Sequence, residues 1–320
     1  MEYRRLGGSE LRVSVVALGC GSFGGLGAMR RFVGLGENEQ EARALLDAAY
    51  ECGINLLDTA NAYGGGASEE WIGTWLREHP SVRDELVITS KAGADGLSAA
   101  HIRTELEESL RRLGTDRVDL YLSHGPDPRT PLEETLAAFD ALVRAGKIRC
   151  YGLCNVDAAE IAKAVDLAGT HGWHRPVNVQ VGHNLLEPAD PGILETCAEL
   201  GIGVTSFSSL AGGWLAEIYR AGGPYPATSR MAVLPQRYAN VERLAAAGAV
   251  DALRAEADRR GVALPTLALA WILADPTVSA ALIGPSLPEH LTPAIAAAGY
   301  VLEPAERAAL TAIVDGVGVP

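Results

Sequence analysis

The sequence predicts an α/β protein with the architecture of a (β/α)8 TIM barrel, and three observations carry this prediction. Short runs rich in Val, Ile and Leu alternate with helical patterns along the whole chain. Eight such runs occur, which is the number of strands in a closed parallel barrel. The length of 320 residues suits a barrel that forms a single domain over residues 1–320.

The eight predicted strands are short and apolar, as expected of strands that are buried on both faces. They cover residues 15–19, 55–58, 86–91, 118–123, 148–153, 177–181, 203–208 and 278–283. Between them, apolar residues three and four positions apart predict amphipathic helices. The clearest of these helices cover residues 39–52, 98–113, 132–145, 158–168 and 266–274.

Three segments lie outside this repeating pattern. The short runs Tyr3-Arg-Arg-Leu and Leu11-Arg-Val flank Gly7 and Gly8, which predicts an N-terminal β-hairpin that caps the barrel floor. Residues 211–240 form a long insertion, containing Gly and Pro, after the seventh strand. This insertion follows the carboxyl end of a strand, which is the catalytic face of such barrels. Residues 303–314 predict an extra C-terminal helix.

Composition limits the classes of partner. The 27 basic residues against 40 acidic ones give a net charge of −13, which argues against binding nucleic acid or an anionic membrane. No run of apolar residues approaches the length of a membrane span, and the N-terminus has no apolar signal segment. We therefore expect a cytoplasmic protein. The five scattered cysteines fit reduced thiols better than a disulfide framework.

Two motifs invite interpretations that the sequence does not favour. Residues 19–24 match G-x-G-x-x-G, but further glycines follow and the next helix starts only near Glu39. A dinucleotide-binding turn of the Rossmann type needs a helix that begins within the motif. His171 and His174 have the spacing of a metal pair, but no third ligand is near them, so we expect no metal site.

Four polar residues stand at or just after the ends of successive predicted strands: Asp58, Tyr63, Lys91 and His124. In a barrel these ends converge on one mouth. Tyr63 is a weak acid, a nearby Lys91 ammonium lowers its pKa, and Asp58 keeps the ammonium charged and oriented. His124 can polarise a carbonyl oxygen. Together they provide a proton donor and fixed dipoles for the negative charge that develops when a carbonyl is reduced.

The segments that carry these residues resemble the aldo-keto reductase family. The stretch from Asn55 to Gly64, with Ser68 and Glu69 following, is similar to the family's first signature. Residues 89–91 and 119–124 resemble the next two. The resemblance implies an NAD(P)H-dependent oxidoreductase that reduces an aldehyde or ketone, or oxidises a sugar or alcohol. It also implies that Tyr63 is the general acid and base, and that Asp58, Lys91 and His124 complete the catalytic set.

The resemblance also implies residues that bind the cofactor. Gly152-Leu-Cys-Asn resembles a G-x-S-N motif that holds the nicotinamide carboxamide, although Cys replaces Ser here and is a weaker donor. An aromatic residue stacks on the nicotinamide in the family, and a Phe offers the same ring face. The implied set over the barrel strands and the following loop is Cys154, Asn155, Gln180, Phe207, Ser208, Leu210 and Gly212.

The adenosine end departs most from the family. Gly284, Ser286 and His290 are the expected contacts after the eighth strand, but residues 283–294 contain no Lys or Arg to bind a 2′-phosphate. Ile218 also stands where relatives carry a basic residue. Arginines in the insertion are the candidate substitutes, namely Arg220, Arg230 and Arg237. The resemblance favours NADP(H) over NAD(H), while the local sequence predicts weak discrimination between them.

Two other functions stay open at this stage. A strand-end lysine such as Lys91 suits a Schiff-base lyase, although an Asp58 partner would keep its amine protonated. A nucleotide-sensing regulatory protein of the same fold is the second alternative. The sequence leaves open the substrate, the direction of reaction and the oligomeric state. The residues expected as pocket-lining candidates are Phe23, Met29, Trp71, Trp214 and Tyr225.

Overall fold

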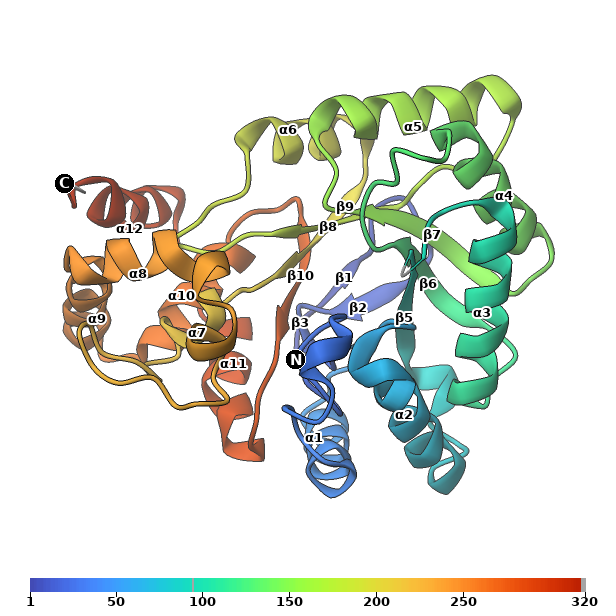
Figure 1. The fold of residues 1–320 in the computed structure, drawn as a ribbon. Coiled ribbons are helices and arrows are strands. Elements are labelled where there is room, and N and C mark those ends of the chain that lie inside the picture. The colour runs from blue at the N-terminus through green and yellow to red at the C-terminus, as the bar shows by residue number, and fades with distance from the viewer. Residues whose placement is uncertain (94, 318–320) are drawn as a thin grey trace.

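A closed parallel barrel of eight strands forms the centre of the protein (Figure 1). The computed structural model describes residues 1–93 and 95–317. The barrel order is β10-β3-β4-β5-β6-β7-β8-β9. The strands are β3 (Val16–Gly19), β4 (Leu56–Asp58), β5 (Val87–Ala92), β6 (Val118–Ser123), β7 (Ile148–Cys154), β8 (Asn178–Gly182), β9 (Gly203–Phe207) and β10 (Val278–Ile283). All eight predicted strands are confirmed, with ends displaced by at most one residue.

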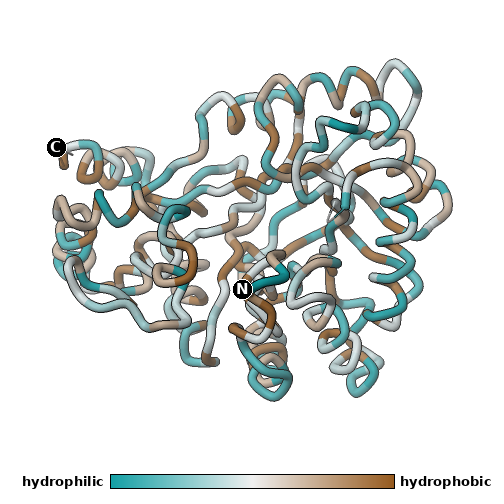
Figure 2. The backbone as a smooth tube through the Cα atoms, viewed as in Figure 1, coloured by the Kyte–Doolittle hydropathy of each residue, from teal (hydrophilic) through white to brown (hydrophobic). Residues whose placement is uncertain are grey.

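Helices surround the barrel and connect its strands. They are α1 (Glu39–Glu51), α2 (Ala67–Glu78), α3 (Ala99–Leu113), α4 (Leu132–Arg144), α5 (Ala158–His171), α6 (Pro191–Leu200), α10 (Leu264–Leu273) and α11 (Leu291–Ala298). Local sequence sets several of their starts. Asn38 caps α1 in a capping box with Glu41, and Asp157 does the same for α5 with Glu160. In Figure 2 helices such as α1, α2 and α3 show hydrophilic and hydrophobic colours in alternation, as amphipathic helices do, whereas α10 is buried along its whole length.

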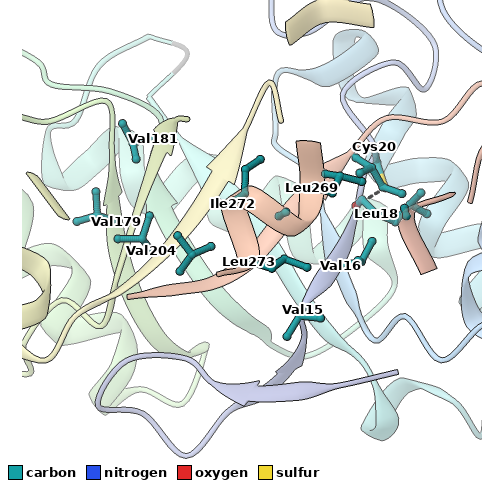
Figure 3. Packing of buried hydrophobic residues seen from close by; sticks show 14 of the residues in the cluster. Val15, Val16, Leu18, Cys20, Val179, Val181, Val204, Leu269, Ile272 and Leu273 are labelled. Atoms are coloured by element: carbon teal, nitrogen blue, oxygen red, sulfur yellow. Dashed lines mark hydrogen bonds between the residues drawn. The ribbon is translucent and has the colours of Figure 1, made fainter. Parts of the chain in front are cut away.

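Side chains of the strands alternate between two apolar clusters. Ala17, Leu56, Val87 and Leu120 belong to the cluster inside the barrel. Their neighbours in sequence belong to the cluster between the strands and the helices, where Val16 and Leu18 pack near α10 residues such as Leu269 and Ile272 (Figure 3). This alternation follows from the twofold repeat of a strand. It fixes which residues at the carboxyl ends of the strands point toward the barrel axis.

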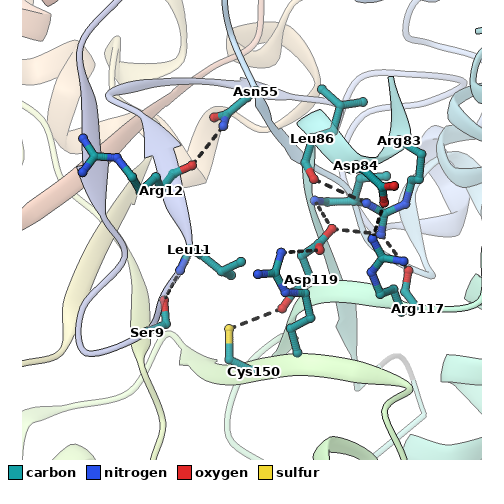
Figure 4. A network of polar contacts seen from close by, with 12 residues as sticks. Ser9, Leu11, Arg12, Asn55, Arg83, Asp84, Leu86, Arg117, Asp119 and Cys150 are labelled. Carbon is teal, nitrogen blue, oxygen red and sulfur yellow. Dashed lines mark hydrogen bonds and ion pairs between the residues drawn. The ribbon is translucent and has the colours of Figure 1, made fainter. Parts of the chain in front are cut away.

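The predicted N-terminal hairpin closes the floor of the barrel. Strands β1 (Tyr3–Arg5) and β2 (Arg12–Ser14) pair antiparallel. Leu6, Leu11 and Val13 are buried in the inner apolar cluster, so the hairpin excludes water from that end. A polar network borders the floor (Figure 4). There Asp119, which has no exposed surface, binds Arg83 at 2.9 Å and Arg149 at 3.2 Å.

The chain after β9 carries the predicted insertion. It contains the short helix α7 (Arg230–Val233), followed by α8 (Ala239–Ala246) and α9 (Ala249–Arg260). The predicted C-terminal helix is α12 (Pro304–Asp315), and it packs on α9 at one side of the barrel (Figure 1). Among residues 1–93 and 95–317, no helix is long and apolar enough to cross a membrane.

Candidate active site

Alternation along the strands points three of the predicted residues into the barrel mouth. In β4 the inward residue is Leu56, so Asp58, two positions on, also points inward. The same twofold repeat relates Val87 to Lys91 in β5 and Leu120 to His124 just after β6. Apolar side chains thus fill the lower barrel, and polar ones occupy its carboxyl end.

Lys91 is the centre of the cluster. It is 1% exposed, and its Nζ donates to Asp58 Oδ1 at 2.6 Å, to the carbonyl oxygen of Thr59 at 2.9 Å and to Tyr63 Oη at 3.1 Å. Three acceptors satisfy the three protons of the ammonium group. The structure therefore brings together Asp58, Tyr63 and Lys91, as the sequence predicted.

The protonation states follow from burial and neighbouring charge. Burial lowers the pKa of Lys91, but Asp58 and the other neighbours raise it more, so the net shift is upward. Burial raises the pKa of Tyr63 more than the Lys91 ammonium lowers it. Lys91 thus acts on Tyr63 in the expected direction without making it more acidic than a free tyrosine. Tyr63 carries its proton at neutral pH, as a proton donor must.

His124 borders Tyr63 on the open side of the cluster. The two rings meet edge to face with centroids 5.4 Å apart. Burial and the Lys91 ammonium lower the pKa of His124 to about 3. Its imidazole is therefore neutral at neutral pH and carries one N–H that can donate a hydrogen bond.

A turn of glycines places Tyr63 over the barrel. Gly64, Gly65 and Gly66 have φ values of 58°, 68° and 105°, in the left-handed region that favours glycine. At Gly64 a Cβ atom would also lie 2.4 Å from the carbonyl oxygen of Phe23. The Tyr-Gly-Gly-Gly segment therefore folds back tightly enough to direct the tyrosine inward.

A cavity of about 710 Å³ opens beside Tyr63 and runs toward the end of β10. Nine of the predicted cofactor-binding residues line it: Cys154, Asn155, Gln180, Phe207, Ser208, Leu210, Gly212, Gly284 and Ser286. His290 is not among the residues that line this cavity. Its side chain is exposed, and its Nδ1 accepts a hydrogen bond of 3.3 Å from the backbone N–H of Ser286, which does line the cavity.

The polar groups at the inner end of the cavity are already engaged with one another. Gln180 donates to Asp58 at 2.7 Å, and the Cys154 thiol donates to Gln180 at 3.8 Å. Asn155 donates to the carbonyl oxygen of His124 at 3.0 Å. Asn155 and Ser208 both have a left-handed backbone, with φ of 58° and 54°. Such backbone strain in residues other than glycine gathers at functional sites.

The insertion contributes one positively charged side chain to the wall of this cavity. Arg230 lines it, whereas the other two candidate arginines, Arg220 and Arg237, are not among the residues that line it. Arg220 faces Glu217 at 3.7 Å, and Arg237 lies 5.9 Å from the Phe207 ring. Opposite Arg230 stands Glu37, which sequence reasoning missed because it lies in a glycine-rich loop without a motif.

A second cavity of about 1060 Å³ meets the first at His124. Its lining combines apolar residues and glycines with polar and charged ones, which include Arg30, Asn61, His101 and the acidic Asp95, Glu105, Glu108 and Asp127. Phe23, Met29, Trp71, Trp214 and Tyr225 are absent from the linings of both cavities, within the part of the chain that the structure describes. Phe23 and Trp214 are instead buried in the core, because their rings pack under the loops rather than facing the mouth.

The glycine motif at residues 19–24 and the pair His171 and His174 have other surroundings in the structure. Residues 19–24 end β3 and continue into turns, without a helix. His171 pairs with Glu133 at 2.9 Å and His174 with Asp140 at 2.7 Å. Within residues 1–93 and 95–317, no group of three or more His, Cys, Asp or Glu is placed to hold a metal ion.

The model of the aldo/keto reductase family matches residues 17–315, nearly the whole chain. The chain belongs to the aldo/keto reductase family. This aldo/keto reductase is therefore an oxidoreductase enzyme, and its family generally uses a nicotinamide cofactor.

Relatives over the full length carry related names. The chain is 32% identical to the uncharacterized oxidoreductase YrpG of Bacillus subtilis, across 99% of this chain and 97% of the relative. It is 33% identical to L-glyceraldehyde 3-phosphate reductase of Escherichia coli K12, across 91% and 86%. It is 30% identical to versiconal hemiacetal acetate reductase of Aspergillus parasiticus, across 96% and 95%.

The residues around the first cavity fit a dinucleotide. Its volume lies within the range of small-molecule sites, about 300–1,000 Å³. The ring of Phe207 lines its inner part, near Tyr63, and Arg230 and Ser286 line its outer part. The lining thus includes amide groups and an aromatic ring, which suit a nicotinamide, and a cation, which suits a phosphate.

Proposed function

We propose that this enzyme is an NAD(P)H-dependent reductase that converts an aldehyde or ketone to the alcohol, with Tyr63 as general acid. The observation that carries the proposal is the Lys91 ammonium, held between Asp58 and Tyr63 at the mouth of the barrel. When bound, a reduced nicotinamide cofactor supplies the hydride for the carbonyl carbon. Side chains of the protein bind and orient the substrate and supply the proton.

Each side chain has a distinct task in the proposed reduction. Neutral His124 donates a hydrogen bond to the substrate carbonyl oxygen and so orients and polarises it. Tyr63 gives its proton to the same oxygen as negative charge develops there. Lys91 stabilises the tyrosinate that remains, and Asp58 keeps Lys91 in place. In the reverse direction the Tyr63 oxygen would accept the proton of an alcohol or a sugar hydroxyl.

Cofactor contacts follow the lining of the first cavity. We propose that Asn155, Gln180 and Cys154 contact the nicotinamide carboxamide and that Phe207 stacks on the ring. Ser208, Leu210 and Gly212 would surround the diphosphate, and Gly284 and Ser286 the adenosine end. NADP(H) is the favoured form, with Arg230 as the cation for its 2′-phosphate, and NAD(H) is the alternative.

The substrate side favours a small hydrophilic carbonyl compound. The cavity beside His124 is lined by arginine, asparagine and histidine side chains and by four acidic ones, Asp95, Glu105, Glu108 and Asp127, as well as by apolar residues. A hydroxylated aldehyde or sugar satisfies such groups, whereas a large apolar ketone would leave them without partners. The name of the Escherichia coli relative, a reductase of L-glyceraldehyde 3-phosphate, agrees with this class.

A Schiff-base lyase suits this site less well. The nucleophile of such an enzyme is a neutral amine. Lys91 is instead protonated and saturated with acceptors, and a carbonyl carbon has no open approach to its Nζ. Trapping with borohydride would label Lys91 if the lyase were the true activity.

The proposed function is tested by a screen of aldehydes, ketones and polyols with both cofactors. We expect loss of reduced-cofactor absorbance with short hydroxylated aldehydes, and little with bulky apolar ketones. Slow turnover with every compound, together with tight retention of cofactor, would favour a nucleotide-sensing protein instead.

A further inference from the structure

Glu37 is an acidic residue in the wall of the cavity that we assign to the cofactor. It lies between β3 and α1, where its backbone N–H donates to the carbonyl oxygen of Ser22 at 2.9 Å. Its own carbonyl oxygen accepts from Gly24, also at 2.9 Å. The two bonds hold the residue against the end of β3. The backbone of Glu37 is therefore held in place, and the residue lines the cavity.

The surroundings of this carboxyl group disfavour its charge. Oε2 is buried and has no hydrogen-bond partner among the described residues. Burial raises the pKa of Glu37, and the hydroxyls of Ser22 and Ser286 and the Arg230 guanidinium oppose that shift only in part. An ionised carboxylate with an unsatisfied buried oxygen is costly, so the neutral acid gains relative to the anion.

The other acidic groups near Glu37 are either paired or neutral. Glu37 is therefore the acid in this region whose negative charge would be least compensated. Asp58 is neutralised by Lys91, and Glu41 on α1 accepts the N–H of Asn38 in its capping box. Tyr63 and Cys20 are neutral, since burial raises the pKa of each. Arg230 provides the one nearby positive charge among the described residues of the cavity wall, and His290 accepts a hydrogen bond from the backbone N–H of Ser286.

A dinucleotide brings a dianionic diphosphate into this cavity. The negative charge of the bound diphosphate would act on Glu37 across the cavity, and the bound molecule would shield Glu37 from water. Both effects favour the neutral acid, whose hydroxyl can also donate to a phosphate oxygen. Resting on the proposed function, we propose that Glu37 takes up a proton when a nicotinamide dinucleotide binds, so that cofactor affinity falls as the pH rises.

The direction of the pH dependence follows from the pKa of Glu37 in the free enzyme and in the enzyme with bound cofactor. A bound anion raises the pKa of Glu37 above its value in the free enzyme. Below both values Glu37 is protonated in either state, and binding involves no proton. Between them, binding takes up as much as about one proton, and the dissociation constant rises by up to about tenfold per pH unit. Above both values binding again becomes independent of pH, at a weaker affinity.

Titration calorimetry of the full-length enzyme with NADH tests the proposal. NADH is the probe because it lacks the 2′-phosphate, whose own titration would obscure the measurement. Binding heats in buffers of different ionisation enthalpy give the number of protons exchanged, at intervals between about pH 5 and pH 9. We expect uptake of a substantial fraction of a proton, and a dissociation constant that increases by about tenfold across this range.

Three variants make the assignment specific. Glu37→Gln keeps the shape but has no charge, so it should bind NADH with an affinity independent of pH and about tenfold tighter than wild type at the alkaline end. Glu39→Gln removes an exposed acid of the same helix start outside the cavity, and should retain the wild-type profile. His290→Gln should also retain it, because His290 is not among the residues that line the cavity.

The possible results are distinguishable. Proton uptake that persists in Glu37→Gln, or wild-type binding that is independent of pH, would overturn the inference. Weaker NADH binding by Glu37→Gln at every pH would show that the carboxylate accepts hydrogen bonds from a ribose, which also overturns it. Absence of binding by either NADH or NADPH would instead contradict the proposed function.

Discussion

Gln180 donates a hydrogen bond of 2.7 Å to Oδ2 of Asp58, from β8 across the barrel to β4. The other oxygen of Asp58 accepts from Lys91 at 2.6 Å. The carboxylate therefore links the wall of the cofactor cavity to the ammonium group beside Tyr63. This arrangement leads to separate predictions for the members of the cluster.

Lys91→Met removes the positive charge beside Tyr63 and leaves Asp58 buried without a cation. We expect turnover to fall about 10²–10⁴-fold, the range of general acid and base catalysis. Because the ammonium lowers the pKa of Tyr63, its loss should move the rising part of the alcohol-oxidation profile to higher pH. Asp58→Asn retains the ammonium and should be less harmful. If the oxidation rate of Lys91→Met rose over the same pH range as that of wild type, the proposed effect of Lys91 on the pKa of Tyr63 would be contradicted.

Phe207→Ala removes the aromatic face from the inner part of the cofactor cavity. The loss should weaken binding of reduced cofactor by roughly 1–3 kcal/mol, the scale of a stacked aromatic ring. Fluorescence titration measures the effect. Phe207→Tyr preserves the ring face and serves as the matched control, with an affinity near that of wild type. An unchanged dissociation constant for the alanine variant would make Phe207 only a packing residue.

Arg230→Met should reduce discrimination between the two cofactors. The side chain is the cation at the outer end of the cavity, so NADPH binding should weaken about tenfold more than NADH binding, or ~1.4 kcal/mol. His290→Ala is the control, because its ring does not line the cavity. The ratio of kcat/KM for NADPH and NADH measures the effect. If His290→Ala lost the preference for NADPH and Arg230→Met retained it, His290 and not Arg230 would be the group that binds the 2′-phosphate.

Gly73→Ala tests the packing that supports the Tyr63 turn. Gly73 lies in α2, and a Cβ atom there would be 2.1 Å from the carbonyl oxygen of Arg112. We expect a loss of about 1–3 kcal/mol in the free energy of unfolding, as for other overpacked sites. Gly169→Ala in α5 meets nothing within 4 Å and should gain roughly 0.5–1 kcal/mol. If the two substitutions changed the thermal unfolding temperature equally, the close packing of Gly73 against Arg112 would not contribute to stability as proposed.

Much of this architecture could be predicted because it depends on local pattern. Strand and helix periodicities are short-range properties, and they located every barrel strand. The inward direction of Asp58 and Lys91 follows from the same twofold repeat once the apolar cluster is known. Clustering of the strand-end residues then follows from barrel closure, so a few sequence positions determine much of the site.

Other features could not be predicted because they depend on where loops cross. The sequence named Arg230 only as one of three candidate arginines and did not indicate Glu37, because the two residues lie nearly two hundred positions apart and face one cavity only after two irregular segments fold over the barrel. Their sequence neighbourhoods contain no periodic pattern. His290 was expected to contact the cofactor, and in the structure its exposed ring accepts a hydrogen bond from the backbone N–H of Ser286. Long loops thus set the details of cofactor recognition.

The most direct test of the central claim is single-turnover reduction by Tyr63→Phe. This substitution removes one hydroxyl, the atom 3.1 Å from Lys91 Nζ, and preserves the ring. We predict that the rate of carbonyl reduction falls by at least about 10²-fold, while the dissociation constant for NADPH stays within about twofold of wild type. A reduction rate within about threefold of wild type would contradict Tyr63 as the proton donor.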